Sequence, residues 1–328
     1  MRIAIVGTGH VAKDCYLPFL SSQKDVELSY FSRTAAKAQA CATAFGGKVC
    51  GSLAELLGTD PDAVFVLTNE TTRADVLRDL VPLKPRRLFL EKPLVARQGQ
   101  DNVTEEDFET ARDLMAQLQA QGCQTAMIFN YRFFDQVLAA KEILAQRSWG
   151  TAVNAVAAVN YACWSHCIDL LHTFVGPAET ILAQESGLQH RSGKTAVADL
   201  AASVRFAGGA AGTILGTWSM NFGFPLFELI VNFSGGRFHL RCLDGDLEVL
   251  DYATKRHEIL SVTRNTSRWD QYRASFGKAI GAYLESLRRG EAAPVPGKAG
   301  LEELQFEAAL RRSVRLGRAV QVSREFPL

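Results

Sequence analysis

The chain has 328 residues, with 36 basic and 35 acidic side chains that give a formal net charge of +1. This length favours two domains with separate cores, and the near-neutral charge offers no broad attraction to nucleic acid or to a membrane surface. No apolar run approaches the roughly 18 residues that cross a bilayer, and we expect no signal peptide. The seven cysteines are scattered in a chain too long to need disulfides, so we expect reduced thiols and a cytoplasmic location.

Short β-rich runs alternate with segments of helical period from Arg2 to about Met127, a pattern typical of βαβ units in a parallel sheet. The expected strands cover residues 3–6, 26–31, 63–67, 87–90 and 124–128. Expected helices cover residues 11–20 and 34–45, and a further helix begins at Thr104, where Thr104 and Asp107 form a capping pattern. Residues 1–124 are therefore predicted to form an α/β domain with a doubly wound, parallel Rossmann sheet.

The pattern changes after Asn130. One helix, over residues 134–145, precedes long β-rich segments that are interrupted by glycine pairs at 208–209 and 235–236. Two final helices, over residues 269–288 and 301–316, flank a proline-containing turn. We predict an α+β domain over residues 125–328 with a large, mostly antiparallel sheet. Two of its segments, 213–219 and 227–233, are partly apolar on both faces, which predicts burial against another subunit in a homodimer or homotetramer.

The first strand runs into a glycine-rich turn with the pattern G-x-G-x-x-A, from Gly7 to Ala12. Gly7 permits a tight turn, Gly9 lets the backbone approach a pyrophosphate, and Ala12 allows close packing of the next helix on the strand. The helix N-terminus presents N–H groups and a positive dipole end to the anion. Because the turn joins a strand to a helix at the start of a βαβ series, it predicts dinucleotide binding. The expected contacts from this turn are Gly7, Thr8, Gly9, His10 and Val11.

The end of the second strand indicates which dinucleotide is bound. An acidic residue ~20 positions beyond the fingerprint normally accepts the ribose 2′-OH of NAD. Hydroxyl and cationic side chains stand there instead, namely Ser32, Arg33, Thr34 and Lys37. Arg33 is able to bind a 2′-phosphate bidentately or to stack on adenine, so the sequence favours NADP over NAD. The alternative is that Arg33 merely begins an exposed helix.

Four further motifs resemble those of the glucose-fructose oxidoreductase and inositol dehydrogenase family, Gfo/Idh/MocA. They are Thr68-Asn69-Glu70-Thr71, Glu91-Lys92-Pro93 after the strand at 87–90, Asn130-Tyr131-Arg132, and a His-x-x-Asp pattern at His166 and Asp169. The resemblance implies hydride transfer between nicotinamide C4 and a substrate carbon, commonly a carbinol of a sugar or polyol, with Lys92 and His166 facing that carbon. It also implies cofactor contacts from Thr68, Asn69, Glu91 and Lys92.

The chemistry of the residues is consistent with this implication. Removal of hydride from a carbinol needs a base for the hydroxyl proton, and a histidine suits this work near neutral pH, so His166 is the expected acid/base. Lys92 is expected to hydrogen-bond the substrate oxygen and to stabilise a developing alkoxide. Asp169 shares the helix face of His166 and, by resemblance, contacts substrate hydroxyls; alternatively, it pairs with a cation. Trp164 is expected to stack on the C–H face of a sugar.

The sequence departs from the family pattern in two places. Many relatives have an Asp four residues before the histidine, where this chain has Ala162, and the preceding loop is short. That Asp would orient or charge the imidazole, and Asn160, Tyr161 or Ser165 are candidates to take over its hydrogen bonding. Asn160 and Tyr161 are also expected to contact the substrate. In the loop that begins at Thr68, the family's usual Pro after Thr and its His after the second Thr are absent, and Thr72 and Arg73 stand there.

We therefore expect an NADP(H)-dependent dehydrogenase or reductase that acts on a hydroxyl or keto group of a small, sugar-like substrate. Two alternatives remain open. The same fold with a rebuilt site would reduce a C=N or conjugated double bond, or the protein would sense a dinucleotide without catalysis. Cys163, His166 and Cys167 lie at helical spacing, but zinc needs a fourth ligand and nicotinamide chemistry needs no metal, so we expect no metal site.

Overall fold

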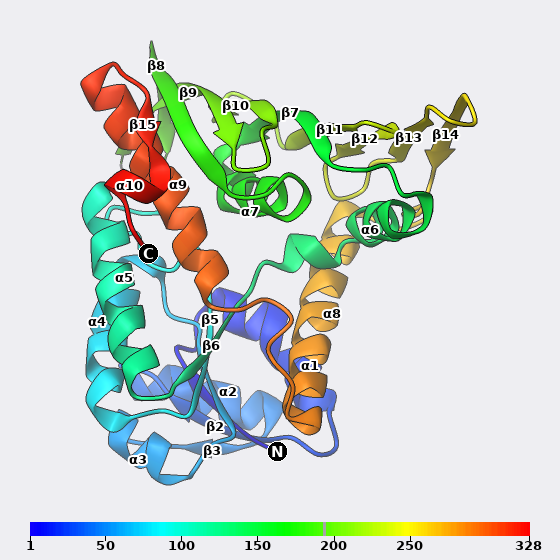
Figure 1. The fold of residues 1–328 in the computed structure, drawn as a ribbon. Coiled ribbons are helices and arrows are strands. Elements are labelled where there is room, and N and C mark those ends of the chain that lie inside the picture. Colours follow the sequence, from blue (N-terminus) through cyan, green and yellow to red (C-terminus); the bar gives the residue numbers. More distant parts are fainter. Residues whose placement is uncertain (193–194) are drawn as a thin grey trace. The chain divides into compact units, whose positions relative to one another are not determined.

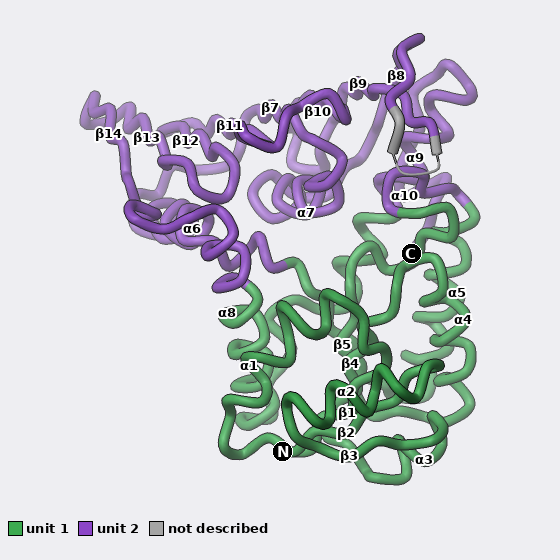
Figure 2. The backbone as a smooth tube through the Cα atoms, turned by 180° about the vertical axis from the view of Figure 1, so that it is seen from behind, with its two compact units in different colours: residues 1–99, 106–129, 276–304 green, residues 100–105, 130–275, 305–328 purple. Residues whose placement is uncertain are grey.

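The computed structural model describes residues 1–192 and 195–328, which divide into two compact units. The first unit comprises residues 1–99, 106–129 and 276–304, and the second comprises residues 100–105, 130–275 and 305–328 (Figure 2). The sequence interpretation places a single boundary after residue 124, with residues 276–304 in the second domain. In the structure these residues pack with the first unit, so each unit is assembled from separate stretches of the chain.

The first unit is built on a six-stranded parallel sheet (Figure 1). The sheet has the strand order β3-β2-β1-β4-β5-β6, which is that of a Rossmann fold, so the predicted fold class is confirmed. The elements in chain order are β1 (Arg2–Val6), the π-helix η1 (Ala12–Tyr16), α1 (Leu17–Ser22), β2 (Glu27–Phe31), α2 (Ala35–Phe45), β3 (Lys48–Val49), α3 (Leu53–Gly58), β4 (Ala63–Val66), α4 (Glu70–Leu80), the 3₁₀-helix η2 (Val81–Leu83), β5 (Arg87–Leu90), α5 (Glu105–Ala120) and β6 (Gln124–Met127).

Helices cover both faces of this sheet, so its central strands are apolar along their whole length. Ile3 and Ile5 of β1 are fully buried, as expected for a parallel strand with helices on either side. On one face the ring of Tyr16 lies edge-on to Phe65 and Phe89, with ring centroids 6.2 Å apart in each case. Helices α4 and α5 cover the other face (Figure 1).

The helix after the glycine turn differs from the expected regular helix over residues 11–20. Its first part is the π-helix η1, and α1 follows it directly. Because Pro18 has no N–H, it cannot bond to the carbonyl of Asp14. The N–H of Leu17 bonds to the carbonyl of Ala12, five residues back, which widens the helix.

The second unit contains a nine-stranded sheet with the order β14-β13-β12-β11-β7-β10-β9-β8-β15. The sheet is mostly antiparallel, as predicted, but β7 and β10 pair in parallel. The remaining elements are the 3₁₀-helix η3 (Asn130–Phe133), α6 (Asp135–Arg147), β7 (Ala152–Asn160), the 3₁₀-helix η4 (Tyr161–Cys163), α7 (Trp164–Phe174), β8 (Ala178–Ser192), β9 (Thr195–Phe206), β10 (Ala211–Thr217), β11 (Phe227–Phe233), β12 (Gly236–Arg241), β13 (Leu247–Asp251), β14 (Arg256–Leu260), α8 (Arg268–Arg289), α9 (Lys298–Leu316), β15 (Val320–Gln321) and α10 (Val322–Glu325). None of the described helices is both long and apolar enough to span a bilayer.

The two faces of the nine-stranded sheet have different environments. Helices α6 and α7 lie on one side of it (Figure 1), and the side chains that alternate toward that side form the core. The opposite face is open and carries exposed apolar side chains from several strands. Val156 on β7, Leu182 on β8 and Leu215 on β10 are 46%, 44% and 45% exposed.

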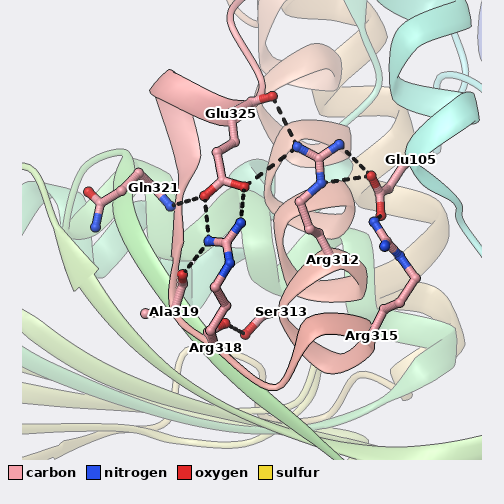
Figure 3. A network of polar contacts seen from close by, with 8 residues as sticks. All are labelled: Glu105, Arg312, Ser313, Arg315, Arg318, Ala319, Gln321 and Glu325. Atoms are coloured by element: carbon pink, nitrogen blue, oxygen red, sulfur yellow. Dashed lines mark hydrogen bonds and ion pairs between the residues drawn. The ribbon is translucent and has the colours of Figure 1, made fainter.

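A network of ion pairs fastens the carboxyl-terminal end of the second unit (Figure 3). The carboxylate of Glu105 accepts hydrogen bonds from Arg312 at 2.5 Å and from Arg315 at 2.8 Å. The carboxylate of Glu325 is bound bidentately by Arg318 at 2.9 and 3.0 Å, and Arg312 approaches it at 3.6 Å. Helix α9 is thereby tied both to residues 100–105 and to α10.

Candidate active site

A cleft of about 240 Å³ opens at the carboxyl ends of β1, β2 and β4. In an open α/β sheet, ligands bind where the strand order reverses, which here is between β1 and β4. The structure brings together in this cleft most of the residues predicted to contact the cofactor. These lining residues are Gly7, Thr8, Gly9, Ser32, Arg33, Thr34, Lys37, Thr68 and Asn69.

The glycine turn has the shape that a bound pyrophosphate requires. Gly7 has φ +97°, and a Cβ there would lie 2.9 Å from the backbone nitrogen of Thr68, so only glycine fits. A Cβ at Gly9 would meet nothing within 4 Å, which leaves open space above the turn. The hydroxyl of Thr68 is buried and has no hydrogen-bond partner among the described residues. The turn therefore fits a dinucleotide phosphate, which would occupy the open space and supply an acceptor.

The wall of the cleft beyond β2 is cationic. Of the described residues that line the cleft, Arg33 and Lys37 carry positive charge and none is acidic. Thr34 is the N-cap of α2, and the backbone N–H of Lys37 bonds to its carbonyl at 2.9 Å. Both cationic side chains are exposed at the start of this helix. The site thus attracts an anionic group at this end.

The loop after β4 is held by its own side chains. Asn69 caps α4, because its Oδ1 accepts the backbone N–H of Thr71 at 3.0 Å and the hydroxyl of Thr71 at 2.6 Å.

His10 and Val11 do not line the cleft. His10 is exposed and its Nδ1 lies 2.8 Å from the carboxylate of Asp14, and Val11 is 38% exposed.

Glu91 holds the segment that carries Lys92. The Glu91 side chain is buried, and its Oε1 accepts a hydrogen bond of 2.6 Å from the hydroxyl of Tyr16. Its Oε2 accepts the backbone N–H of Lys92 at 3.0 Å. Lys92 itself is half-buried. The described contacts of the Glu91 carboxylate are thus internal to the domain and fix the backbone from which Lys92 projects.

Arg73 is a residue of this region whose role the sequence did not predict. It is 2% exposed. Its guanidinium donates hydrogen bonds to the backbone carbonyl of Thr68, in the loop after β4, and to that of Glu91, in the loop after β5. Burial lowers the pKa of Arg73, and the nearby carboxylates of Glu91 and Glu70 act in the opposite direction. The available signal was that this loop departs from the family pattern at Thr72 and Arg73.

In the second unit, His166 lies on α7 and is 2% exposed. Its ring stacks on the ring of Tyr131, with centroids 3.9 Å apart and an interplanar angle of 7°. The hydroxyl of Tyr131 donates a hydrogen bond of 3.2 Å to the sulfur of Cys163. Burial raises the pKa of Tyr131, so this phenol is a neutral support for the imidazole. The plane of the His166 ring is therefore fixed by packing.

Asp169 forms an ion pair with Arg132. The Nε and Nη2 atoms of Arg132 donate to the two carboxylate oxygens at 2.8 and 2.5 Å. The side chain of Asp169 is 1% exposed, and that of Arg132 is 19% exposed. The structure thus contains the cation pairing that the sequence left open as an alternative to a contact with substrate.

Asn160 is fully buried at the end of β7. Its Oδ1 accepts the backbone N–H of Ala162 at 2.9 Å, and its Nδ2 donates to the carbonyl of Met220 at 3.1 Å. Both functional groups of this amide therefore bind backbone in the structure. The short connection η4 follows directly, so Asn160 fixes the start of the turn into α7.

Tyr161 and Trp164 fill space between α7 and the sheet. The hydroxyl of Tyr161 donates to the carbonyl of Ala198 at 2.7 Å. A Cβ at Gly216 of β10 would lie 2.7 Å from both aromatic rings, which shows how closely they pack on this strand. Each side chain is 2% exposed. The sequence signal for this packing was Gly216, the second-to-last residue of β10.

A Rossmann sheet with a glycine turn and an open, non-acidic cleft at the reversal of strand order defines the class of dinucleotide-binding proteins. Residues 1–129 match the model of the oxidoreductase family with an NAD-binding Rossmann fold, Gfo/Idh/MocA. This match over the first 129 residues confirms the resemblance that the sequence motifs indicate. No curated protein is similar enough in sequence to match the chain.

Solved structures show the same fold over nearly the whole chain. An oxidoreductase from Agrobacterium radiobacter in complex with NAD+, L-tartaric acid and magnesium has a TM-score of 0.81 at 15% identity, covering 99% of each chain. The WlbA dehydrogenase from Bordetella pertussis, in complex with NADH and UDP-GlcNAcA, has a TM-score of 0.75 at 18% identity, covering 98% of this chain and 97% of its own. A putative myo-inositol dehydrogenase from Sinorhizobium meliloti 1021 has a TM-score of 0.74 at 18% identity, covering 98% and 99%.

Proposed function

We propose that this protein is an NADP(H)-dependent oxidoreductase that transfers a hydride between nicotinamide and a hydroxyl or keto carbon. The substrate is a sugar, a cyclitol or a sugar-derived metabolite. The observation that carries the cofactor assignment is the cationic, non-acidic end of the cleft beside Arg33 and Lys37. A ribose 2′-phosphate would bring two negative charges there, and charge-assisted hydrogen bonds to a guanidinium are among the strongest that proteins make.

In this proposal the cofactor supplies the hydride acceptor or donor, and the chain supplies binding and proton handling. The glycine turn receives the pyrophosphate, and the residues after β2 receive the 2′-phosphate. The ammonium of Lys92 hydrogen-bonds the reacting substrate oxygen and stabilises negative charge on it. The imidazole of His166 exchanges a proton with that oxygen. The fixed backbone at Lys92 and the stacked ring of His166 support these roles, because both groups are preorganised.

The assignment of NADP is tested by fluorescence titration with NADPH and NADH. We expect NADPH to bind at least about tenfold more tightly, and Arg33→Ala to remove most of that difference, which corresponds to about 1.4 kcal/mol. Arg78→Ala is the matched control, because Arg78 is an exposed arginine on α4 that pairs with Asp75 and does not line the cleft. A preference for NADPH that survives Arg33→Ala would remove the assignment.

The reaction class is tested with a panel of polyols and ketoses, followed at the nicotinamide absorbance. Oxidation or reduction that is lost in Lys92→Ala and His166→Ala supports the proposal. A reductase of a C=N or conjugated double bond is the second candidate, favoured by the three-residue connection η4 between β7 and α7, which carries Ala162. Turnover of an imine or enone that persists in His166→Ala would select this candidate. Binding without turnover, unchanged in Lys92→Ala, would indicate a dinucleotide sensor.

We also propose that the open face of the nine-stranded sheet is the contact between subunits of a homodimer or homotetramer. The exposed apolar side chains on β7, β8 and β10 support this proposal, because apolar side chains gathered on one face of a sheet are typical of a surface that another protein covers. A cytoplasmic location is proposed as well. It is supported by the seven cysteines, all within the described residues, none of which is joined in a disulfide.

A further inference from the structure

We propose that Arg73 is the positioning residue of the active site: its buried guanidinium joins the cofactor loop after β4 to the Lys92 segment after β5. This inference rests on the proposed function, because it assigns to Arg73 the task of placing Lys92 and Thr68 relative to each other. Arg73 itself does not line the cleft. It acts through the backbone of the residues that do.

The hydrogen bonds of Arg73 connect two loops that are distant in sequence. Its Nη1 donates to the carbonyl of Glu91 at 2.7 Å, and also to the carbonyls of Pro93 and Leu94. Its Nη2 donates to the carbonyl of Thr68 at 2.6 Å. Thr68 lines the dinucleotide cleft, and the three other acceptors bracket Lys92. The guanidinium of Arg73 thus holds both the loop that lines the dinucleotide cleft and the segment that carries Lys92.

The charge of Arg73 strengthens this argument. A guanidinium that is 2% exposed has lost nearly all of its water, which is costly unless its donors are paired. Both Nη atoms of Arg73 are paired, whereas its Nε is buried without a hydrogen-bond partner among the described residues. The carboxylate of Glu91 compensates part of the charge. This same carboxylate binds the N–H of Lys92 and the hydroxyl of Tyr16. Arg73, Glu91 and Lys92 are therefore linked in series, so a displacement of the cation is transmitted to the backbone of Lys92.

A histidine in place of Arg73 cannot make this set of contacts. An imidazole has two ring nitrogens, whereas a guanidinium has five N–H donors in a fixed plane. The four carbonyl acceptors of Arg73 thus require the arginine found in this chain. Lysine retains the charge but presents a single nitrogen. Arg73→Lys therefore tests whether the arrangement of the donors is needed in addition to the positive charge.

The test compares full-length Arg73→Lys and Arg73→Met with Arg78→Lys and Arg78→Met, which alter an exposed arginine of the same helix. Two properties are measured. The first is the Kd for NADPH, by fluorescence titration. The second is the rate of trace acetylation of Lys92 relative to the exposed Lys84, by peptide mass spectrometry between about pH 7 and 10. Circular dichroism establishes that each variant is folded at the assay temperature.

We expect Arg73→Lys to weaken NADPH binding by about tenfold, which corresponds to about 1.4 kcal/mol, and to change the relative acetylation of Lys92 by at least about threefold. The Arg78 variants should match the wild type in both properties. Unchanged acetylation of Lys92 in folded Arg73→Lys would overturn the inference. So would a uniform rise in the acetylation of all lysines, because it would indicate a merely structural role.

Two further outcomes are also decisive. If the wild type binds no NADPH, the proposed function fails, and the acetylation of Lys92 alone then decides the role of Arg73. If Arg73→Lys does not fold, Tyr16→Phe replaces it, because this change removes the hydrogen bond that the Tyr16 hydroxyl donates to the Glu91 carboxylate. Altered acetylation of Lys92 in Tyr16→Phe supports the series of contacts, and unaltered acetylation refutes it.

Discussion

Replacement of Asp169 by Asn separates a structural role for this residue from a contact with substrate. Asp169 and Arg132 share two hydrogen bonds of 2.8 and 2.5 Å, and the carboxylate is 1% exposed. Removal of one partner from a buried pair costs about 3–5 kcal/mol. Asn retains one acceptor oxygen, and Arg132 is 19% exposed and so reaches some water. We therefore expect Asp169→Asn to lower the free energy of unfolding by about 2–3 kcal/mol.

Urea unfolding followed by tryptophan fluorescence measures this change in the relevant part of the molecule. All four tryptophans, at positions 149, 164, 218 and 269, lie in the second unit together with Asp169. The double variant Arg132→Met/Asp169→Leu should recover most of the lost stability, because apolar pairs replace buried ion pairs well. A loss below about 0.5 kcal/mol, within the range of an exposed pair, together with a raised KM, would refute the structural role.

Two other changes give distinct expected outcomes. Arg318 holds the pKa of Glu325 at about 2, below its unfolded value, so this pair stabilises the folded state above about pH 4.5 and loses its effect as the pH falls toward 2. Glu325→Gln should therefore reduce the acid-dependent fall of the thermal midpoint in this range. Leu215→Lys places a charge on the open face of the sheet, so it should lower the molar mass measured by light scattering to that of the monomer.

Matched controls make these two outcomes specific. Glu106→Gln alters an exposed carboxylate near the network of Glu105 and should leave the acid dependence unchanged. Leu138→Lys alters an apolar residue on α6 that is 39% exposed, on the covered side of the sheet, and should leave the molar mass unchanged. A monomeric wild type, or an oligomer that tolerates Leu215→Lys, would contradict the proposed subunit contact.

Local sequence predicted most of the residues that line the dinucleotide cleft, because each group of these residues comes shortly after a strand. Gly7 comes after β1, Arg33 after β2 and Thr68 after β4, and the carboxyl ends of parallel strands meet at one edge of a sheet. No local signal identified the partners of Asp169, Tyr161 and Arg73. Their partners lie 37 residues away for Asp169, 37 for Tyr161 and up to 21 for Arg73.

The amino-acid sequence by itself determined the Rossmann domain, its glycine turn and the chemistry available after each strand, because hydrophobic period and turn residues act over a few positions. Only the tertiary structure decided that residues 276–304 pack with the first unit, that β7 and β10 pair in parallel, and that the buried Arg73 binds two loops. The partners of a buried polar group are selected by the whole fold, since many groups of the same type occur along the chain and burial leaves few of them within reach.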